Sequence, residues 1–368
     1  MKTAREPELR AAPHIEAIPP TIPFIGPEEL MREGGHGSLL RLGANESNFG
    51  PSPSAVAAMA AELPRVCRYG DPESYDLREA LAARAGCEIE NICVGAGIDD
   101  LMGLAVRAFV GPGTLALATR GTYPTFAYHV TGYGGGLSTV DYRANGSIAV
   151  EALIERACAL HPAIVYLANP DNPSGTFVSR PHVEALLEAM PSQSLLLLDE
   201  AYAEFAPQDV LPAGIDPRLV RMRTFSKAYG MAGARIGYAI STRRTIETFQ
   251  KIRLQYGVNR NAQIGALAAL QDDGYMQGVV AEVARGRDEY VRLADSLGHK
   301  SIASHTNFVC IDFGSAARAE GVVRTLMQRG VFIRKPGMPP LDGYIRVTVG
   351  TPPERVAFAT HLRAVSAA

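Results

Sequence analysis

The sequence lacks the features expected of a membrane, nucleic-acid or secreted protein. Its 36 lysines and arginines nearly balance 38 aspartates and glutamates, giving a formal net charge of −2. Without a basic cluster, this argues against nucleic-acid binding. The longest apolar runs, such as Leu195 to Leu198, are far shorter than the roughly 20 residues that cross a bilayer. The N-terminal residues carry charges where a signal peptide needs an apolar stretch, so we expect a cytoplasmic location and no membrane partner.

Cysteine and histidine are also sparse and irregularly spaced. The five cysteines include no CxxC pair, and the eight histidines follow no HExxH or other zinc-ligand spacing. We therefore expect reduced, mostly buried thiols and no metal site. A hydrophobic content of 47% and a charged content of 20% are those of an ordinary globular protein.

The middle of the chain alternates short apolar runs with segments whose apolar residues have helical spacing. Between residues 92 and 241 the apolar runs are ICVGAG, TLALA, AIVYLAN, SLLLLDEA, LVRMRTFS and IGYAIS. Strands that alternate with helices predict an α/β fold, with a mostly parallel sheet covered on both faces. Such a sheet binds its ligands beyond the carboxyl ends of its strands.

The two ends of the chain differ from this middle part. The first residues are rich in proline and predict an arm. After about residue 256 come long helical segments, three short strands and a closing helix. We therefore expect an N-terminal arm at 1–44 that packs with the small domain, a large domain at 45–255 and a small α/β domain at 256–368.

Three polar side chains lie just after predicted strands. Lys227, in TFSKAYGMAGARIGY, stands among small residues and hydroxyls, unlike a lysine on a solvated helix face. Asp199 ends four leucines, where a buried carboxylate needs a cation or a strong donor, although it could also cap a helix. Asn172 lies in a Pro-Ser-Gly segment that could be no more than a turn.

A candidate anion site precedes them in the chain. Gly95 and Gly97 lead a predicted strand into a helix, and the amides at a free helix start suit a phosphate. Asp100 stands where GxGxxG has its third glycine, so we do not expect a dinucleotide. A lysine, a buried acid and phosphate donors around one crevice are what pyridoxal phosphate requires.

These motifs resemble those of the fold-type I pyridoxal-phosphate-dependent aminotransferases, and most closely the histidinol-phosphate aminotransferase branch, from about Asn45 to the C-terminus. The resemblance implies a large domain with a mostly parallel seven-stranded sheet between helices and a smaller α/β C-terminal domain. It implies that Lys227 is the Schiff-base lysine and general acid/base. It also implies that Asp199 faces the pyridinium nitrogen, and that Asn172 and Tyr202 bond the phenolic oxygen.

The resemblance extends to the remaining cofactor contacts. The residues that would hold the phosphate are Gly97, Ile98, Asp99, Thr224, Ser226 and Arg235. Phe126 matches the aromatic that stacks on the ring. Tyr69 matches the tyrosine that reaches the phosphate in the neighbouring subunit, which implies a homodimer with shared sites.

The resemblance also predicts the residues that bind the substrate. Arg346 would bind the α-carboxylate of the amino-acid partner, and both Arg334 and Arg346 are available for the phosphate of histidinol phosphate, since guanidinium groups suit either anion. Asn45 matches a substrate-side asparagine, and Phe24 lies near where the branch usually has a tyrosine. The implied reaction transfers the amino group of histidinol phosphate to 2-oxoglutarate in histidine biosynthesis.

Two groups of alternatives stay open from the sequence. Aromatic amino-acid aminotransferases and phosphothreonine decarboxylases share the cofactor motifs. A non-catalytic pyridoxal-phosphate-binding regulator is an alternative of another class. A catalytically dead homologue would be expected to lose Lys227 or Asp199, and both are present.

Overall fold

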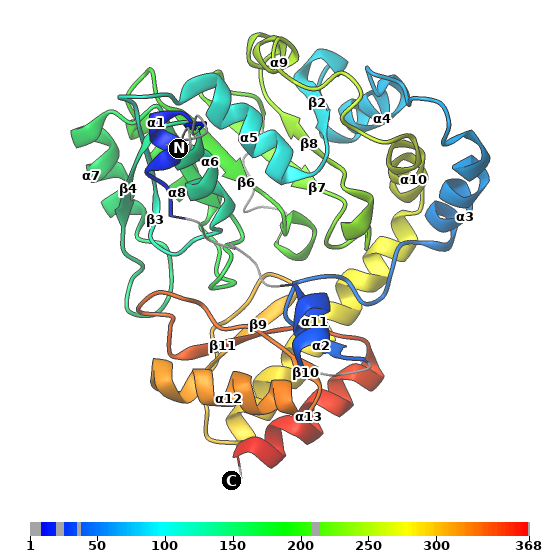
Figure 1. The fold of residues 1–368 in the computed structure, drawn as a ribbon, viewed down its shortest axis with the longest axis vertical. Helices are drawn as coiled ribbons and strands as arrows, with labels where there is room; N and C mark the ends of the chain where they lie inside the picture. Colours follow the sequence, from blue (N-terminus) through cyan, green and yellow to red (C-terminus); the bar gives the residue numbers. More distant parts are fainter. Residues whose placement is uncertain (1–8, 20–25, 35–37, 208–213, 367–368) are drawn as a thin grey trace, which may run out of the picture.

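A seven-stranded sheet lies at the centre of the large body of the molecule (Figure 1). The computed structural model describes residues 9–19, 26–34, 38–207 and 214–366. The strands of the sheet are β2 (Ile92–Gly95), β3 (Leu115–Thr119), β4 (Gly136–Val140), β5 (Ile164–Ala168), β6 (Leu195–Asp199), β7 (Leu219–Thr224) and β8 (Gly237–Ile240). Their order is β2-β8-β7-β6-β5-β3-β4. β8 runs antiparallel to both neighbours and the other pairs are parallel, so the predicted mostly parallel, seven-stranded sheet is confirmed.

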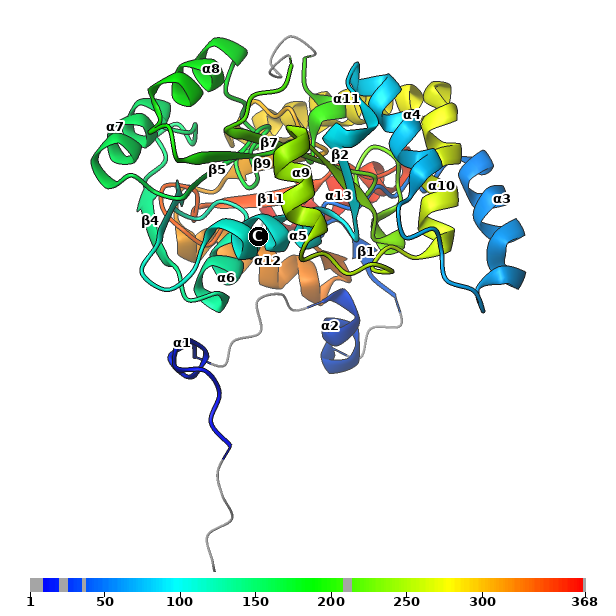
Figure 2. The ribbon, with the colours of Figure 1, turned by 90° about the horizontal axis from the view of Figure 1, so that it is seen from above.

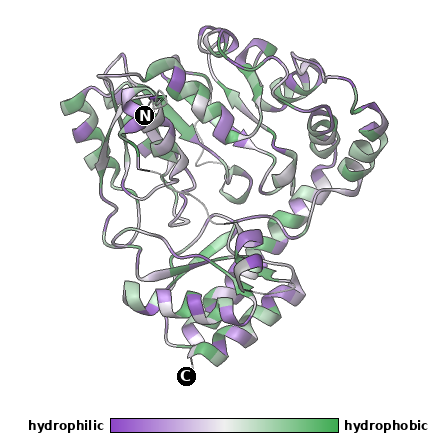
Figure 3. Ribbon diagram, in the orientation of Figure 1, coloured by the Kyte–Doolittle hydropathy of each residue, from purple (hydrophilic) through white to green (hydrophobic). Residues whose placement is uncertain are grey.

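The central strands are apolar throughout because both faces of the sheet are covered. In β6, Leu196 and Leu198 belong to one apolar core, whereas Leu195 and Leu197 belong to another. Successive side chains of a strand point to opposite faces, so the two cores lie on opposite sides of the sheet. Figure 3 shows the sheet as largely hydrophobic, while the outer helices carry both kinds of residue.

Helices flank the sheet, and several begin at caps that the sequence supplies. They are α3 (Pro53–Glu62), α4 (Tyr75–Ala85), α5 (Ile98–Phe109), α6 (Thr125–Gly132), α7 (Val150–Leu160), α8 (Arg180–Ala189), α9 (Arg243–Gln250) and α10 (Arg260–Gln271). The Ser52 hydroxyl accepts a hydrogen bond from the Ala55 amide at the start of α3, and Asn259 accepts one from Ala262 at the start of α10. Each cap satisfies an amide that the first turn leaves unpaired.

A smaller body is built around the antiparallel pair β9 (Phe308–Asp312) and β11 (Tyr344–Thr348). Its helices are α11 (Asp273–Ser296), α12 (Ala316–Gln328) and α13 (Pro352–Ser366). The N-terminal segment contributes α1 (Pro13–Glu16), α2 (Pro27–Gly34) and β1 (Leu40–Arg41), and β1 pairs in parallel with β10 (Val331–Phe332). Figure 2 shows α1 and α2 on one side of the molecule, outside its main layers.

The proposed domain boundaries at residues 44 and 255 stay a prediction. The pairing of β1 with β10 joins the end of the N-terminal segment to the small body. α10, which follows residue 255, packs against α3 and α4 of the large body. The chain therefore crosses from the large to the small body after α10, along α11.

Some general expectations can also be compared with the structure. All five cysteines are free thiols, but the expectation that most are buried is wrong: Cys67 and Cys158 are exposed, since they lie in a turn after α3 and on the outer side of α7. Over the described residues, no helix has the length and apolar character needed to cross a membrane. The same residues contain no group of three or more histidines, cysteines and acids that could hold a metal ion.

Candidate active site

The side chains predicted to carry chemistry follow the carboxyl ends of β5, β6 and β7. These strands are parallel neighbours, and Asp199, the last residue of β6, lies opposite Ala168 of β5 and Met222 of β7. Asn172 follows β5 by a short loop, and Lys227 comes three residues after the end of β7. The shared edge of the sheet therefore brings these residues to one region, as the alternating pattern requires.

Asp199 is a buried acid whose hydrogen-bond donors are neutral. The Tyr166 hydroxyl donates to Oδ2 at 2.8 Å, and the Ala201 amide donates to Oδ1 at 3.0 Å. The residue is 4% exposed, and burial raises its pKa to about 6 although these hydrogen bonds act in the opposite direction. Asp199 thus has the capacity to bind a further cationic donor.

Lys227 is a half-buried amine whose ammonium form is disfavoured. Burial, followed by the positive charge of Arg346, lowers its pKa to about 8. Its Nζ donates to the backbone oxygen of Asn45 at 3.0 Å and lies 5.7 Å from the ring centroid of Tyr202. About one molecule in ten then carries the neutral, nucleophilic amine at pH 7.

Tyr202 and Asn45 form a second polar pair beside this amine. The Asn45 side-chain amide donates to the Tyr202 hydroxyl at 2.9 Å, and both residues are buried. The Tyr202 ring packs edge-on against Phe308 of the small body. Burial raises the pKa of Tyr202 to about 12, so the phenol keeps its proton and can donate it in a hydrogen bond.

Arg346 enters the same region from β11 of the small body. Its Nη1 donates to Oδ1 of Asn172 at 2.5 Å, which leaves the Asn172 amide nitrogen free to serve as a donor elsewhere. The buried Nε of Arg346 has no hydrogen-bond partner among the described residues. Because buried donors are normally paired, this nitrogen indicates a place for an anion.

Arg334 lies next to Arg346. The backbones of the two residues exchange hydrogen bonds of 3.3 and 2.6 Å. Burial and the charge of Arg346 lower the pKa of Arg334, and its guanidinium lies over the ring of Phe332. Two arginines on adjacent backbone segments make this edge of the small body electropositive.

A cradle for a second anion lies at the start of α5. Gly97, with φ of 92°, caps the helix, and a Cβ there would lie only 2.7 Å from Nη2 of Arg235. Helix geometry leaves the amides of Ile98 and Asp99 without intrahelical acceptors. Arg235 also approaches the Asp99 carboxylate at 3.5 Å. Only a glycine permits the guanidinium to lie this close to the helix start.

Two buried hydroxyls lie at the end of β7, Thr224 as its last residue and Ser226 in the turn that follows. Thr224 Oγ1 donates to Ser226 Oγ at 2.9 Å, and the Ser226 amide donates back to Thr224 Oγ1 at 3.0 Å. Thr224 pairs with Gly237 across β7 and β8, and a Cβ on Gly237 would meet the amide of Ile98 at 3.2 Å. The hydroxyls of Thr224 and Ser226 therefore lie close to Arg235 and to the start of α5.

Comparison with known proteins identifies the family. The aminotransferase class I and II family matches residues 38–362. The chain belongs to this family. The aminotransferase is 32% identical over 374 residues to a histidinol-phosphate aminotransferase of Moorella thermoacetica, covering 99% of this chain and 94% of the relative.

Solved structures agree with this assignment. The aminotransferase superposes with a TM-score of 0.94 on a histidinol-phosphate aminotransferase from Sinorhizobium meliloti in complex with pyridoxal 5'-phosphate, at 42% identity and covering 100% and 99% of the two chains. An L-threonine-O-3-phosphate decarboxylase from Porphyromonas gingivalis gives a TM-score of 0.75 at 22% identity, covering 88% of this chain and 98% of that one, which shows the shared fold alone. The chain is thus a pyridoxal-phosphate-dependent transaminase of fold type I.

The residues of the site fit this cofactor. Lys227 offers a partly neutral amine, and Asp199 offers a buried carboxylate with no cation among its hydrogen-bond donors. Gly97 leaves the space through which Arg235 reaches the helix start. A phosphate, a pyridinium and an aldehyde would therefore each meet a suitable group of the aminotransferase.

The stacking of Phe126 on the cofactor ring stays a prediction, and the surroundings of Phe126 do not favour it. Phe126 is 1% exposed, belongs to an apolar core and stacks on Tyr166 with centroids 4.6 Å apart. Tyr123 is partly exposed and its hydroxyl donates to Asp99 at 3.0 Å, while burial, followed by the charge of Asp99, raises its pKa. Tyr123 is therefore the better candidate for the aromatic beside the cofactor. Its signal in the sequence is an aromatic residue in the loop between a strand and a helix.

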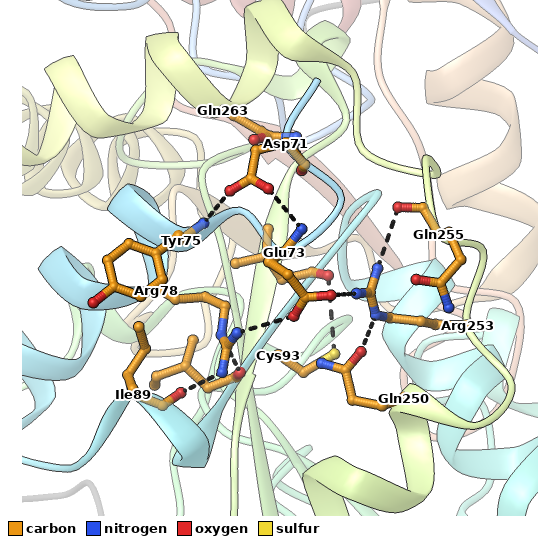
Figure 4. Close-up of polar contacts among 12 residues, drawn as sticks. Asp71, Glu73, Tyr75, Arg78, Ile89, Cys93, Gln250, Arg253, Gln255 and Gln263 are labelled. Atoms are coloured by element: carbon orange, nitrogen blue, oxygen red, sulfur yellow. Dashed lines mark hydrogen bonds and ion pairs between the residues drawn. The ribbon is translucent and has the colours of Figure 1, made fainter. Parts of the chain in front are cut away.

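Tyr69 lies on the surface, in a segment held by ion pairs. Its side chain is 76% exposed and stacks on Tyr256 with centroids 4.5 Å apart. In the same segment Glu73 contacts both Arg78 and Arg253, at 3.4 and 3.1 Å (Figure 4). These ion pairs fasten the segment that carries Tyr69 to the segment between α9 and α10.

Phe24, predicted near the substrate, lies outside the described residues. A buried acid that sequence reasoning missed is Asp171, directly before Asn172. Tyr142 donates to both of its oxygens at 3.1 Å, and the Ser174 amide donates to Oδ2 at 2.9 Å. Asp171 thereby anchors the loop that carries Asn172, and only the neighbouring Asn and Pro residues mark it in the sequence.

Proposed function

We propose that this aminotransferase transfers the amino group of histidinol phosphate to 2-oxoglutarate, a step of histidine biosynthesis. Relatives with that name cover nearly the whole chain, including the one from Moorella thermoacetica. The observation that carries the proposal is the paired Arg334 and Arg346, with the unpartnered Nε of Arg346.

The chemistry of the two substrates explains why this pair matters. Histidinol phosphate has a phosphate but no carboxylate, whereas 2-oxoglutarate has two carboxylates. A planar guanidinium accepts either anion through two parallel hydrogen bonds. The same two arginines can therefore hold a different anion in each half of the reaction.

Each residue then has a defined task. Bound pyridoxal phosphate withdraws electrons from the substrate Cα. The amine of Lys227 would accept a proton from the substrate Cα, which its pKa of about 8 permits near neutral pH. Asp199 would keep a proton on the ring nitrogen of the cofactor, and Tyr202 and Asn172 would donate to its phenolic oxygen. The residues that would hold the phosphate are Thr224, Ser226, Arg235 and the amides of Ile98 and Asp99.

A single half-reaction tests the substrate. The loaded chain is mixed separately with histidinol phosphate, phenylalanine and phosphothreonine, and the loss of its visible absorbance is followed. We expect fast bleaching by histidinol phosphate alone. Bleaching mainly by phenylalanine, or carbon dioxide released from phosphothreonine, would overturn the substrate. Absence of bleaching by any amino donor would favour a non-catalytic regulator.

We also propose that two copies of the chain form a homodimer in which Tyr69 of each copy reaches the phosphate held by the other. Several large apolar side chains near Tyr69 are strongly exposed in the single chain. They are Leu63, Val66, Leu254 and Tyr256, which are 58%, 69%, 75% and 55% exposed. Such a patch around an exposed tyrosine is typical of an interface.

Mixing two inactive variants tests the shared site. One chain carries Lys227→Ala and the other Tyr69→Ala, and they are mixed after mild dissociation. In a hybrid with two-fold symmetry one site has both defects and the other has neither, so we expect the mixture to regain about a quarter of native activity. If sedimentation shows that hybrids form but activity does not return, the exchange of Tyr69 between subunits is contradicted. If the chain is a monomer at assay concentrations, the dimer itself is contradicted.

A cytoplasmic location is proposed as well. The free state of all five cysteines, two of them exposed, is what a reducing compartment favours. Fractionation of cells that express the protein would test this, and recovery outside the cytoplasmic fraction would contradict it.

A further inference from the structure

Asn45 has an unusual backbone conformation that residues of the small body maintain. Its φ is 54°, in the left-handed region, and it is 2% exposed. Asparagine tolerates this conformation better than most residues with a side chain, and here hydrogen bonds with residues of the small body hold it. Its amide donates to Thr348 Oγ1 at 3.1 Å, and that hydroxyl approaches Asn45 Oδ1 at 3.4 Å.

Asn307 provides a second hold on the same residue. Its Nδ2 donates to the backbone oxygens of Asn45 and Glu46, both at 3.1 Å. Asn307 directly precedes β9, and Thr348 ends β11 opposite Phe308, the first residue of β9. Both contacts therefore come from one end of the small antiparallel pair.

Asn45 passes these contacts on to the large body. Its side-chain amide donates to Tyr202, and its backbone oxygen accepts from Lys227. That oxygen therefore accepts from both Asn307 and Lys227, which uses its two lone pairs. A change in the backbone angle of Asn45 would disturb Tyr202 and Lys227 together.

We propose that Thr348 is a positioning residue for the reaction, because its hydroxyl keeps Asn45 left-handed and thereby sets the directions of Tyr202 and Lys227. Thr348 lies two residues after Arg346 on β11. β11, which carries Arg346 for the substrate anion, is thus connected through Thr348 and Asn45 to Tyr202 and Lys227. The inference rests on the proposed function in assigning Tyr202 and Lys227 to the cofactor.

The test replaces the hydroxyl with a methyl group of similar size. Thr348→Val leaves the Asn45 amide without its acceptor, so we expect Asn45 to relax and its contact with Tyr202 to be lost. The hydrogen bond from Asn45 lowers the pKa of Tyr202, so the variant phenol donates less readily to the cofactor oxygen. We expect the pH midpoint of the visible absorbance of the pyridoxal-phosphate-loaded chain to rise by about one unit.

Two further variants keep the test decisive. Thr348→Ser retains the hydroxyl and should restore the native midpoint, whereas Asn307→Ala removes the second hold and should shift it in the same direction as Thr348→Val. A native midpoint in Thr348→Val, or an equal shift in Thr348→Ser, would overturn the inference, the latter because packing of the methyl group would then be the cause.

A structure of the Thr348→Val chain without cofactor gives a readout that does not depend on the proposed function. Asn45 found at negative φ, with its amide turned away from Tyr202, would support the inference. Asn45 still left-handed and still bonded to Tyr202 would overturn it. If the native chain bleaches with none of the amino donors while the Thr348→Val structure shows the relaxed Asn45, the proposed function is refuted and the control of Asn45 by Thr348 is sustained.

Discussion

Asp199 and Glu200 are consecutive buried carboxylates whose surroundings differ sharply. Asp199 accepts hydrogen bonds from a phenol and an amide. The Glu200 side chain is fully buried between Arg221 and Arg223, at 3.0 and 2.8 Å. One carboxylate is neutralised by the chain itself, and the other is available for a cation from outside.

The same contrast recurs between two arginines of the small body. Arg355, 4% exposed, is bound by Glu289, Glu282 and the oxygen of Gly350. Arg346 makes hydrogen bonds to neutral oxygens and keeps a buried Nε unpartnered. In these two comparisons, the structural charge is neutralised by opposite charges of the fold, whereas the charge assigned to a ligand has no such partner among the described residues.

The sharpest way to break this comparison is to remove the two carboxylates separately. Asp199→Asn keeps the shape but cannot hold a proton on the ring nitrogen, so we expect kcat to fall on the order of 10³-fold. Glu200→Gln should leave kcat of the folded enzyme within about threefold of native. Steady-state kinetics on both variants checks this, and an equal loss in Glu200→Gln would erase the distinction.

For stability we expect the reverse, with the larger loss in Glu200→Gln and the smaller loss in Asp199→Asn. Glu200→Gln leaves two arginines without their shared anion, which should cost about 3 kcal/mol in the free energy of unfolding. Because the folded pKa of Asp199 is raised to about 6, its stabilising contribution is present at low pH and lost as pH rises from about 4 to about 6.

Asp199→Asn should therefore lose less stability across that range than the native chain, while Asp171, which has a similarly raised pKa, still contributes in both. Urea unfolding of the cofactor-free chains at pH 4, 5 and 6 measures the difference. Identical pH profiles would show that Asp199 is not perturbed as described.

Arg346→Ala and Arg355→Ala sharpen the contrast in the small body. We expect Arg346→Ala to raise the KM for 2-oxoglutarate by a factor equivalent to at least about 2 kcal/mol, since it removes a charged partner of the substrate. Arg355→Ala should lower the melting temperature and leave that KM nearly unchanged. An unchanged KM in Arg346→Ala would move the anion site elsewhere.

The amine of Lys227 predicts a pH dependence for cofactor uptake. Since its pKa is lowered to about 8, the reactive neutral form grows about tenfold per pH unit below 8 and levels off above it. Stopped-flow mixing of the cofactor-free chain with pyridoxal phosphate gives the rate, and a Lys227→Ala chain subtracts reaction at other lysines. A rate still rising at pH 10 would indicate an ordinary lysine.

The smallest effect is expected at the exposed ion pairs of Glu73. Glu73 is half exposed, so Glu73→Gln should cost less than about 1 kcal/mol in stability. If the segment presents Tyr69 to a second copy, cofactor release should quicken about twofold to threefold in this variant. Glu79→Gln, on the exposed side of α4, is the matched control, and equal release from both variants would remove any role for the ion pairs.

The sequence alone predicts the parts of the site that depend on strand ends. Asn172, Asp199 and Lys227 follow apolar runs, so the fold brings them to one edge of the sheet. It does not distinguish Phe126 from Tyr123, because the choice depends on the direction in which α6 leaves β3. The left-handed conformation of Asn45 depends on Thr348, 303 residues away, and no local pattern specifies such a contact.

The span between Asn45 and Thr348 also constrains how the protein is made. During synthesis the strands from β2 to β8, with Asp199 and Lys227, leave the ribosome before β11 exists. Domains tend to fold in order of synthesis, so the central sheet can form while Asn45 still lacks its partners. A nascent or truncated chain can therefore carry the reactive lysine without the residues that orient it. The completed site appears only when almost the entire polypeptide has been released.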